Sequence, residues 1–355
     1  QMDWMRQVNT EMTVLDEQVL PGTETWTHFE APDGPAGTEV NAIWGEPSGL
    51  LWFGTDEGVT RFSTTGWDLF DETAGKYVLT AWSERPADLW FGTQADGLLH
   101  VRSNRWEAFT TEDGLPSNQI RSVWGSGSRE VWAGTDQGAA RYNGRRWETD
   151  TPSEGLAGLD VRAIWGDGKD TYWFGTEAGL SRYDGDTWTT YTTADGLPSD
   201  QVLALWGDGR GTLWIGSEGG LTRLEIPEDG GDDNAAWTTF TPEDGLVSLR
   251  INVIYGNEAF AEGEGGTLWI GTQDGASAFD GDSWTSYTSA TGLASDDVRA
   301  IWEDIDGQLW VGTAAGLNRF DNRPWIELSV PEGGMVGWAP VHQFEVQIRP
   351  LDSQY

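Results

Sequence analysis

The sequence predicts an all-β fold, a seven-bladed β-propeller built from four-stranded antiparallel blades. A short phrase typified by Leu51-Trp52-Phe53-Gly54-Thr55 recurs seven times, and its tryptophans lie 38, 42, 41, 41, 55 and 41 residues apart. That spacing is the length of one propeller blade. Asp-Gly turns such as Asp184-Gly185 separate short β-branched and aromatic runs, which predicts hairpins because both residues tolerate positive φ. Helical periodicity is missing throughout.

Each repeat divides into four strands, here called A to D. In one unit, residues 202–206 form strand A, a Gly-rich turn follows, and residues 213–217 form strand B. In the preceding unit, residues 179–183 form strand C and residues 188–191 form strand D, with an Asp-Gly-Asp turn between them. The same order of apolar runs and turns repeats along the chain, so each unit predicts one blade.

Tryptophan marks three of the four strands. Strand A ends in Trp in six units and in Tyr255 in the sixth one, strand B holds seven Trp, and eight Trp open candidate D strands, which accounts for 21 of the 23 in the chain. Residues placed so regularly are expected to pack between neighbouring sheets, where each buries about 150 to 250 Å².

The surplus strand-D tryptophan predicts how the ring closes. We expect the N-terminal strand at residues 26–29 to complete the last blade, because Pro324 precedes the competing Trp325 and proline cannot donate to a strand ladder. The predicted organisation is an N-terminal extension over 1–25, the propeller over 26–325, and a tail over 326–355 with one strand near 343–348. The alternative is an eighth blade assembled from residues 335–338, 344–348, 13–20 and 26–29.

Composition excludes several classes of function. With 21 Lys+Arg against 58 Asp+Glu, the formal charge is −37, which disfavours nucleic-acid partners and anionic membrane surfaces. The absence of Cys excludes disulfides and thiolate metal sites, and three His leave little for an imidazole metal site. No apolar run is long enough to span a bilayer. A start at Gln1 and the lack of Cys favour an exported chain, extracellular or periplasmic.

The repeats resemble the two-component regulator propeller family. The resemblance is carried by Asp113-Gly114-Leu115-Pro116-Ser117-Asn118, Leu213-Trp214-Ile215-Gly216 and Gly179-Leu180-Ser181-Arg182-Tyr183-Asp184-Gly185, and it covers roughly residues 26–320. It implies a sensing region of a bacterial membrane receptor, or a secreted relative, that binds a glycan or another small ligand. Fold alone does not specify the ligand.

The seven units also form an internal alignment, in which departures from the repeat point to function. After the first Val or Ile of strand A, the units place Asn41, Leu79, Arg121, Arg162, Leu203, Asn252 and Arg299. These positions are expected near the channel, where Arg121, Arg162, Arg299, Asn41 and Asn252, joined by Arg250, would hold a carboxylate or sugar hydroxyls. The competing interpretation pairs the arginines with nearby acids of the B-to-C turns, such as Asp56, Asp136, Glu177 and Asp274.

Two insertions interrupt the repeat, at residues 225–236 and 257–266. Both are expected on the same face of neighbouring blades, which brings many carboxylates together. Asp229, Asp232, Asp233, Glu262 and Glu264 are candidate calcium ligands, since Ca²⁺ takes six to eight oxygens. The alternative is a solvated acidic protrusion without a cofactor.

Strand C carries arginine at one repeated place in five units, and His100 and Ala278 fill it in the other two. The arginines are expected to stack on tryptophan or to pair between blades. His100 is interpreted as a tolerated substitution rather than a catalytic base.

The leading functional hypothesis is a non-catalytic propeller that recognises a small molecule, glycan or protein through its channel face. A subunit of a surface assembly is the second hypothesis, and a propeller hydrolase or lyase is the third.

Overall fold

The computed structural model describes residues 19–20, 25–126, 130–150, 155–168, 171–226, 235–263, 265–321, 325–328, 336–340 and 347–349. It separates the chain into two compact units. One unit is Thr27–Arg319, and the other combines the terminal segments Gln1–Trp26 and Phe320–Tyr355. The candidate channel residues all belong to the larger unit.

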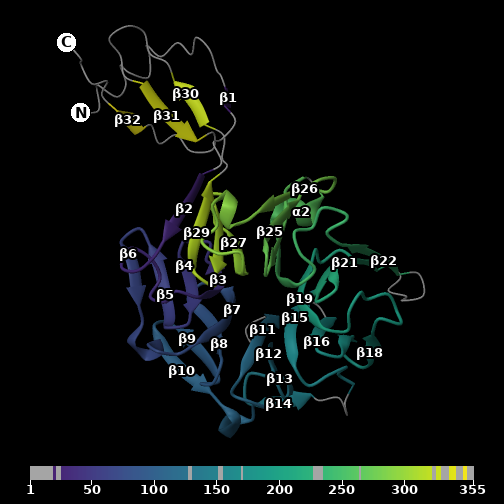
Figure 1. The fold of residues 1–355 in the computed structure, drawn as a ribbon. Coiled ribbons are helices and arrows are strands. Elements are labelled where there is room, and N and C mark those ends of the chain that lie inside the picture. Colours follow the sequence, from purple (N-terminus) through teal and green to yellow (C-terminus); the bar gives the residue numbers. More distant parts are fainter. Residues whose placement is uncertain are drawn as a thin grey trace, which may run out of the picture. The chain divides into compact units, whose positions relative to one another are not determined.

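The larger unit is a ring of seven four-stranded antiparallel blades, as predicted (Figure 1). In chain order the blades are β3 (Val40–Gly45), β4 (Leu51–Thr55), β5 (Gly58–Ser63), β6 (Gly66–Leu69); β7 (Val78–Arg85), β8 (Asp88–Thr93), β9 (Leu98–Arg102), β10 (Arg105–Phe109); β11 (Ile120–Ser126), β12 (Glu130–Thr135), β13 (Gly138–Tyr142), β14 (Trp147–Asp150); β15 (Val161–Gly166), β16 (Tyr172–Thr176), β17 (Gly179–Tyr183), β18 (Trp188–Tyr191); β19 (Val202–Gly207), β20 (Thr212–Ser217), β21 (Gly220–Glu225), β22 (Ala236–Phe240); β23 (Ile251–Gly256), β24 (Leu268–Thr272), β25 (Gly275–Phe279), β26 (Trp284–Tyr287); and β27 (Val298–Glu303), β28 (Leu309–Thr313), β29 (Gly316–Asp321), β2 (Thr25–Phe29). Short 3-10 helices lie at Asp71–Thr73, Thr111–Asp113 and Ser289–Thr291.

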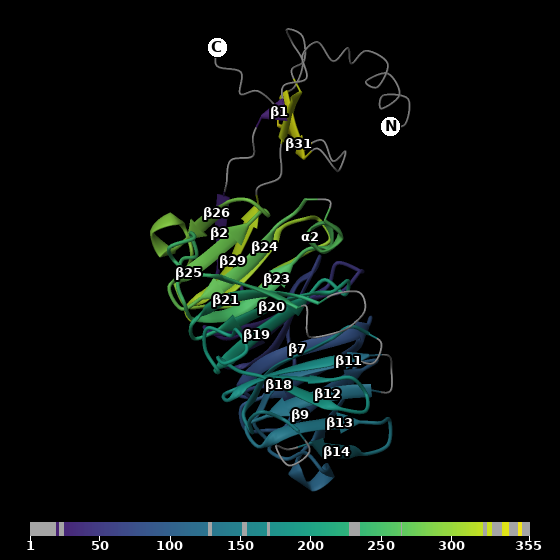
Figure 2. The same ribbon diagram turned by 90° about the vertical axis from the view of Figure 1, so that its right-hand side faces the viewer.

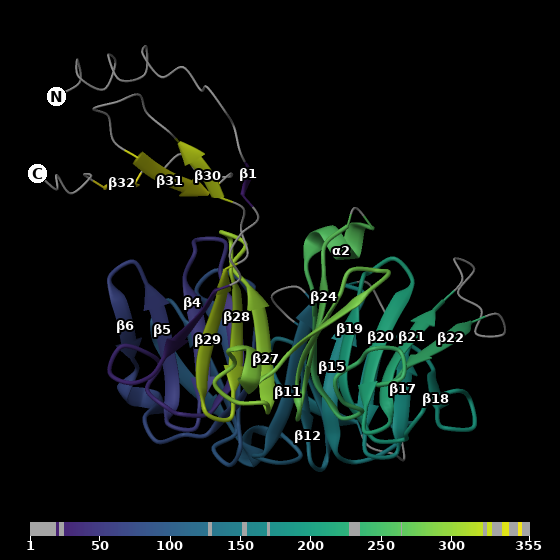
Figure 3. The ribbon, with the colours of Figure 1, turned by 45° about the horizontal axis from the view of Figure 1, so that its top comes forward.

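The N-terminal strand closes the ring. β2 pairs with β29, so the last blade has the order β2-β29-β28-β27 and joins the first and last parts of the propeller sequence. Each A strand contacts the A strands of both neighbouring blades, including β27 with β3, which completes the circle (Figure 3). The prediction that residues 26–29 complete the seventh blade is confirmed.

The alternative of eight blades is wrong. Its strand at 26–29 belongs to blade 7, and the terminal segments form a separate four-stranded sheet in the order β1 (Val19–Leu20), β30 (Trp325–Leu328), β31 (Val336–Pro340), β32 (Gln347–Arg349). Trp325 therefore begins a strand of this sheet and not a D strand of the ring. Where the sequence predicts one strand in the tail, the described residues contain β30, β31 and β32.

Repeated tryptophans pack between blades, as predicted, and glycine makes room for them. The A strand of most blades ends in Trp-Gly. A Cβ added at Gly166 would lie 2.5 Å from the ring of Trp124, and one added at Gly207 would lie 2.5 Å from the ring of Trp165. The tryptophan of one blade thus rests on the glycine of the next, and a larger residue there would push adjacent blades apart.

The repeated arginines of strand C stack on the tryptophans of strand B. Five guanidinium groups lie 5.5 to 5.9 Å from the centroids of these rings, in the pairs Arg61–Trp52, Arg141–Trp132, Arg182–Trp173, Arg223–Trp214 and Arg319–Trp310. The tryptophans are almost fully buried, so each arginine covers one edge of the blade core. The structural interpretation of these arginines is confirmed.

The second insertion contains a short helix that the sequence does not predict. Helix α2 (Glu258–Glu262) begins where the Asn257 side chain accepts a hydrogen bond from the backbone N–H of Phe260 (Figure 2). The ring of Phe260 lies 6.0 Å from Trp206 and 6.2 Å from Trp214. This insertion is therefore anchored by an aromatic contact and is not only a solvated acidic loop.

Candidate functional site

Residues from all seven repeats line a cavity of about 370 Å³ at the channel. All six residues predicted to bind a ligand are in its wall, together with three that the sequence does not single out as ligand contacts. The lining residues are Asn41, Tyr77, Leu79, Arg121, Arg162, Leu203, Arg250, Asn252 and Arg299. The structure thus brings the predicted set together, and its binding role stays a prediction.

A β-bulge presents seven of these side chains, one from each blade, to the channel. In blade 3 the pairing register with strand B shifts between Ile120 and Ser122, which leaves Arg121 without a ladder partner. The same shift occurs at the equivalent position of the other six blades. A bulge re-aims a side chain and ends regular pairing, so this repeated irregularity constructs the ring. The alternation of apolar and polar residues does not reveal this bulge. Because the bulged residue has no ladder partner, its identity can differ from blade to blade.

The first polar part of the ring is the Arg299 cluster, which consists of Arg299, Glu39, Asp297, Tyr77 and Asn41. Nη1 of Arg299 donates to Glu39 Oε2 at 2.6 Å, to Asn41 Oδ1 at 3.0 Å and to Tyr77 Oη at 3.3 Å. Its Nε and Nη2 both lie 3.0 Å from Asp297 Oδ2. Every nitrogen of this guanidinium is therefore engaged.

Hydrogen bonding shifts the pKa values of this cluster. The bond from the Tyr77 hydroxyl, followed by that from Arg299, lowers the pKa of Glu39 below its usual value. Burial and the bond to Glu39 raise the pKa of Tyr77. Burial opposes the charge of Arg299, but its bonds to Glu39 and Asp297 outweigh burial and raise its pKa. These shifts favour the charged guanidinium of Arg299 and the charged carboxylate of Glu39.

The second polar part is the Arg121–Arg162 cluster, in which both guanidiniums share the carboxylate of Asp160. Arg162 Nε donates to Asp160 Oδ2 at 2.9 Å, and Arg121 forms an ion pair with the other oxygen through its Nε. Nη1 of Arg162 makes a long bond of 3.4 Å to Gln201 Oε1. In the described part of the chain, the Nη groups of Arg121 have no hydrogen-bond partner, and neither does Nη2 of Arg162.

Arg250 and Asn252 complete the ring on the side of blade 6. Arg250 forms an ion pair with Glu218, and Asn252 Nδ2 donates to Asp297 Oδ1 and to the carbonyl of Val298, both at 3.0 Å. Leu79 and Leu203 are the apolar members, and each stands between the Arg299 cluster and the Arg121–Arg162 cluster in blade order. The cavity wall thus alternates between polar and apolar sectors.

The arginines are paired with acids, and among the described residues one pair is of the kind that the sequence suggests, Arg250 with Glu218 in a B-to-C turn. Within the described ranges, Asp56, Asp136, Glu177 and Asp274 form no ion pair with them. Glu177 instead accepts hydrogen bonds from the backbone N–H groups of Leu159 and Asp160 and so fixes the turn before strand A. Asp56 does the same for Glu39.

The carboxylate partners of Arg121, Arg162 and Arg299 occupy the position two residues before a ring residue. Asp160 precedes Arg162, Asp297 precedes Arg299 and Glu39 precedes Asn41 by that spacing, and Tyr77, Gln201 and Arg250 occupy the same place in other blades. Residues two apart on a strand lie on the same face, so these residues form a second ring next to the first. They occupy one repeated position in the alignment of the seven units. An alignment of the repeats does not reveal which side chains contact the next blade, as Arg121 contacts Asp160.

The calcium hypothesis falls mostly outside the described residues. Asp229, Asp232, Asp233 and Glu264 are not among them, and Glu262 forms an ion pair with Arg210 at 3.1 Å. Over the described ranges, no group of three or more histidine, aspartate or glutamate side chains is placed to hold a metal ion. A calcium site remains a prediction from the sequence.

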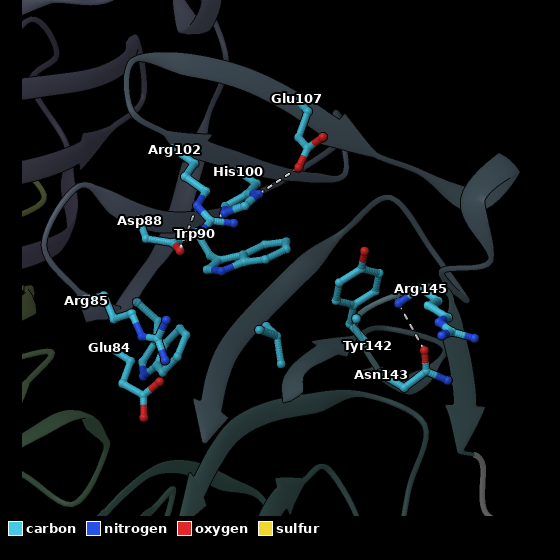
Figure 4. Close-up of a pocket in the computed structure, with 13 residues that line it drawn as sticks. Glu84, Arg85, Asp88, Trp90, His100, Arg102, Glu107, Tyr142, Asn143 and Arg145 are labelled. Atoms are coloured by element: carbon cyan, nitrogen blue, oxygen red, sulfur yellow. Dashed lines mark hydrogen bonds and ion pairs between the residues drawn. The ribbon is translucent and has the colours of Figure 1, made fainter. Parts of the chain in front are cut away.

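A second cavity of about 580 Å³ lies between blades 2 and 3, at the opposite end of β7 from Leu79. We call it the blade 2–3 cleft (Figure 4). It is lined by Trp82, Glu84, Arg85, Asp88, Trp90, His100, Arg102, Glu107, Val131, Tyr142, Asn143, Gly144 and Arg145. The departure from the strand-C arginine at His100 therefore coincides with a cavity.

Solved structures show what this fold resembles. The extracellular domain of a putative hybrid two-component system of B. thetaiotaomicron matches with a TM-score of 0.72 and 17% identity, over 93% of this chain and 46% of that one. Virginiamycin B lyase from Staphylococcus aureus matches with a TM-score of 0.62 and 12% identity, over 84% of this chain and 98% of that one. PorZ, an essential bacterial surface component of the type-IX secretion system of Porphyromonas gingivalis, matches with a TM-score of 0.60 and 14% identity, over 83% and 48%.

These likenesses confirm the propeller fold that the family resemblance implies. The chain spans less than half the length of the sensor domain it matches. No family model and no curated protein matched the sequence. Among the helices in the described part of the chain, none combines the length and apolar character needed to cross a membrane.

Proposed function

We propose that the chain is an exported, non-catalytic binding or sensor propeller that captures a small ligand at its channel cavity. The ligand carries a carboxylate or another anionic group, which contacts the Arg121–Arg162 cluster. The observation that carries this proposal is the charge balance of that cluster, in which two guanidiniums share one carboxylate and retain unused Nη donors. Such donors match a carboxylate in the forked geometry that arginine provides.

The rest of the cavity suits the uncharged part of the same ligand. Asn252 uses its Nδ2 within the protein and leaves its amide oxygen for a sugar hydroxyl, and Leu79 and Leu203 offer apolar contact between the polar sectors. A cavity of about 370 Å³ lies at the lower end of the range typical of small-molecule sites. An acidic monosaccharide or a short organic acid has the corresponding size and chemistry.

The exported setting rests on the sensor-domain likeness and on composition. The matched two-component domains are extracellular, and the absence of cysteine fits the same environment. Binding is favoured over catalysis because the lyase neighbours depend on chemistry that this channel does not present. A variant of the staphylococcal lyase with one histidine replaced by alanine is described as catalytically inactive, whereas none of the described residues lining this cavity is a histidine.

A thermal-shift screen of acidic sugars and organic acids, followed by calorimetry on each hit, tests the proposal. The double variant Arg121→Gln/Arg162→Gln should weaken binding by about tenfold to a hundredfold, since each charged hydrogen bond is worth about 1.5 to 3 kcal/mol. The matched control is Arg146→Gln, which removes an arginine with a 75% exposed side chain that is paired to Glu148 outside the channel. Hits that bind the double variant as tightly as the wild type, or a screen without hits, would refute the proposal.

A further inference from the structure

The blade 2–3 cleft gathers cations in a chain that has few. Only 21 of 355 residues are Lys or Arg. Four arginines line the channel cavity, and three more, Arg85, Arg102 and Arg145, line this cleft. A third of all basic residues therefore face two cavities. In a body with a formal charge of −37, such a concentration marks places where an anion can approach.

Two of these arginines have no acidic partner. Within the described residues, neither Arg85 nor Arg145 takes part in an ion pair, although 58 acids are available in the chain. They lie on opposite walls, with Arg85 at the end of β7 in blade 2 and Arg145 in the turn after β13 in blade 3 (Figure 4). Arg102 is held only loosely, with its Nε 3.6 Å from Asp88 Oδ2 and a side chain that is 67% exposed.

His100 lies at the floor of the cleft between two carboxylates. Its Nε2 is 2.6 Å from Asp88 Oδ1, and its Nδ1 is 2.8 Å from Glu107 Oε1. A neutral imidazole has only one N–H, so its second nitrogen would oppose a carboxylate lone pair. Both contacts are hydrogen bonds only when the ring carries a proton on each nitrogen. The two carboxylates are thus placed to accept from both ring nitrogens of an imidazolium.

The stacking of His100 supports this assignment. Its ring lies parallel to Trp90, with centroids 3.8 Å apart and an interplanar angle of 9°. In five other blades an arginine lies over the equivalent tryptophan, and blade 6 has Ala278 there, so a cation is the usual occupant of this place. Blade 2 alone replaces the permanent charge of arginine by one that depends on a proton.

Because the other charges around the cleft cancel, the proton on His100 determines the net charge of the cleft. Arg85, Arg102 and Arg145 contribute three positive charges, while Glu84, Asp88 and Glu107 contribute three negative ones, so their sum is zero. The other titratable group of the lining is the Tyr142 hydroxyl. The cleft is thus neutral with an imidazole at position 100 and carries one positive charge with an imidazolium.

We propose that the blade 2–3 cleft is a second binding site, which takes a small organic dianion between Arg85 and Arg145 and holds it more tightly when His100 is protonated. The cavity of about 580 Å³ accommodates a sugar diacid or a molecule of similar size. Its two acidic ends meet guanidiniums from the two walls, and Arg102 lies two residues after His100 on β9 (Figure 4). The site is separate from the channel cavity, because the two cavities have no lining residue in common.

Calorimetry with glucarate, a sugar diacid that stays fully ionised across the range used, tests this site. The protein is the Arg121→Gln/Arg162→Gln variant, so that the channel does not contribute, and uncharged glucitol is the control ligand. Glucarate should bind at about pH 5 and about tenfold more weakly at about pH 8, because imidazoles change charge in this range. Glucitol should not bind. Arg145→Gln should weaken glucarate binding by about tenfold or more.

Two substitutions at position 100 distinguish an effect of the charge on His100 from an effect on the folding of the blade. His100→Arg restores the arginine of the other blades and should retain glucarate binding without the pH dependence. His100→Gln should bind weakly at every pH. Melting temperatures of both variants report whether the blade is intact. Absence of glucarate binding at about 10 mM, binding that Arg145→Gln leaves unchanged, or a pH dependence that persists in His100→Arg would each overturn the proposal.

Discussion

The two arginine clusters of the channel occupy the same ring position in different blades and have opposite charge balances. The Arg299 cluster holds one guanidinium and two carboxylates, Glu39 and Asp297, whereas the Arg121–Arg162 cluster holds two guanidiniums and one carboxylate, Asp160. The first is saturated with hydrogen bonds, and the second retains donors. A repeated position therefore does not define a role, because the partners that the next blade supplies decide it.

The place of each cluster in the ring explains the difference. Arg299 reaches from blade 7 to Glu39 and Tyr77, residues 260 and 222 positions away in the sequence, and so bonds across the seam where the ring closes. The Arg121–Arg162 cluster connects blades 3 and 4, which are consecutive in the chain and have no seam to hold. We therefore assign closure to the first cluster and ligand capture to the second.

The largest expected effect is on stability, from Arg299→Met. Removing this guanidinium leaves two partly buried carboxylates, Glu39 and Asp297, without the arginine that pairs with both, and we expect the free energy of unfolding to fall by about 1 to 3 kcal/mol. Urea unfolding followed by tryptophan fluorescence measures it. The matched control is Arg121→Met, which leaves Asp160 paired with Arg162 and should cost less than about 0.5 kcal/mol. Equal losses in the two variants would contradict the division of roles.

The next effect is on affinity, from Asp160→Asn. This change raises the charge of the Arg121–Arg162 cluster from one positive charge to two. A unit charge at about 4 Å in water is worth about 1 kcal/mol, so an anionic ligand found in the screen should bind about fivefold more tightly. Asp297→Asn, the equivalent change in the Arg299 cluster, should lower stability without tightening binding. Calorimetry that finds weaker binding to Asp160→Asn would refute the assignment of capture to this cluster.

A smaller effect is the pH dependence of the Arg299 cluster. The pKa of Glu39 is lowered in the folded state, so its contribution to stability is present above its unfolded pKa near 4.5 and is lost as the pH falls. The pKa of Tyr77 is raised, so its contribution is present below its unfolded pKa near 10 and is lost as the pH rises. Unfolding midpoints measured across both ranges should fall at each end, and Arg299→Met should flatten the acid side. An unchanged acid slope in that variant would count against the pairing.

Much of the fold can be predicted from the sequence because the same pattern of strands and turns recurs seven times. Tryptophan spacing predicts blade number, and proline before Trp325 predicts which strand closes the ring. Helix α2 is not predicted, since five residues are too few to show a helical period and its stability comes from the packing of Phe260 on Trp206 and Trp214.

The site is predicted only in part, for a different physical reason. The ring residues are found because they vary at one repeated place, and the bulge that aims them leaves them free to vary. Their partners are missed because pairing depends on side-chain reach between blades, as from Arg299 to Glu39. His100 is interpreted as a tolerated substitution, and its two carboxylate contacts become visible only when strands β8 and β10 lie on either side of β9.

The smallest expected effect concerns calcium and the acidic insertions, residues 225–236 and 257–266, which in contrast to both channel clusters contain no Lys or Arg. We expect calcium at millimolar concentration to leave the melting temperature unchanged to within about 1 °C, because in the described residues Glu262 is already paired with Arg210. A bound ion at a hundred times its dissociation constant would stabilise the protein by about 2.7 kcal/mol, which corresponds to several degrees. Melting in calcium, in magnesium and in chelator distinguishes these outcomes. A rise specific to calcium that Asp232→Asn abolishes would instead establish the insertions as a metal site, separate from the carboxylates that Arg299 neutralises in the channel.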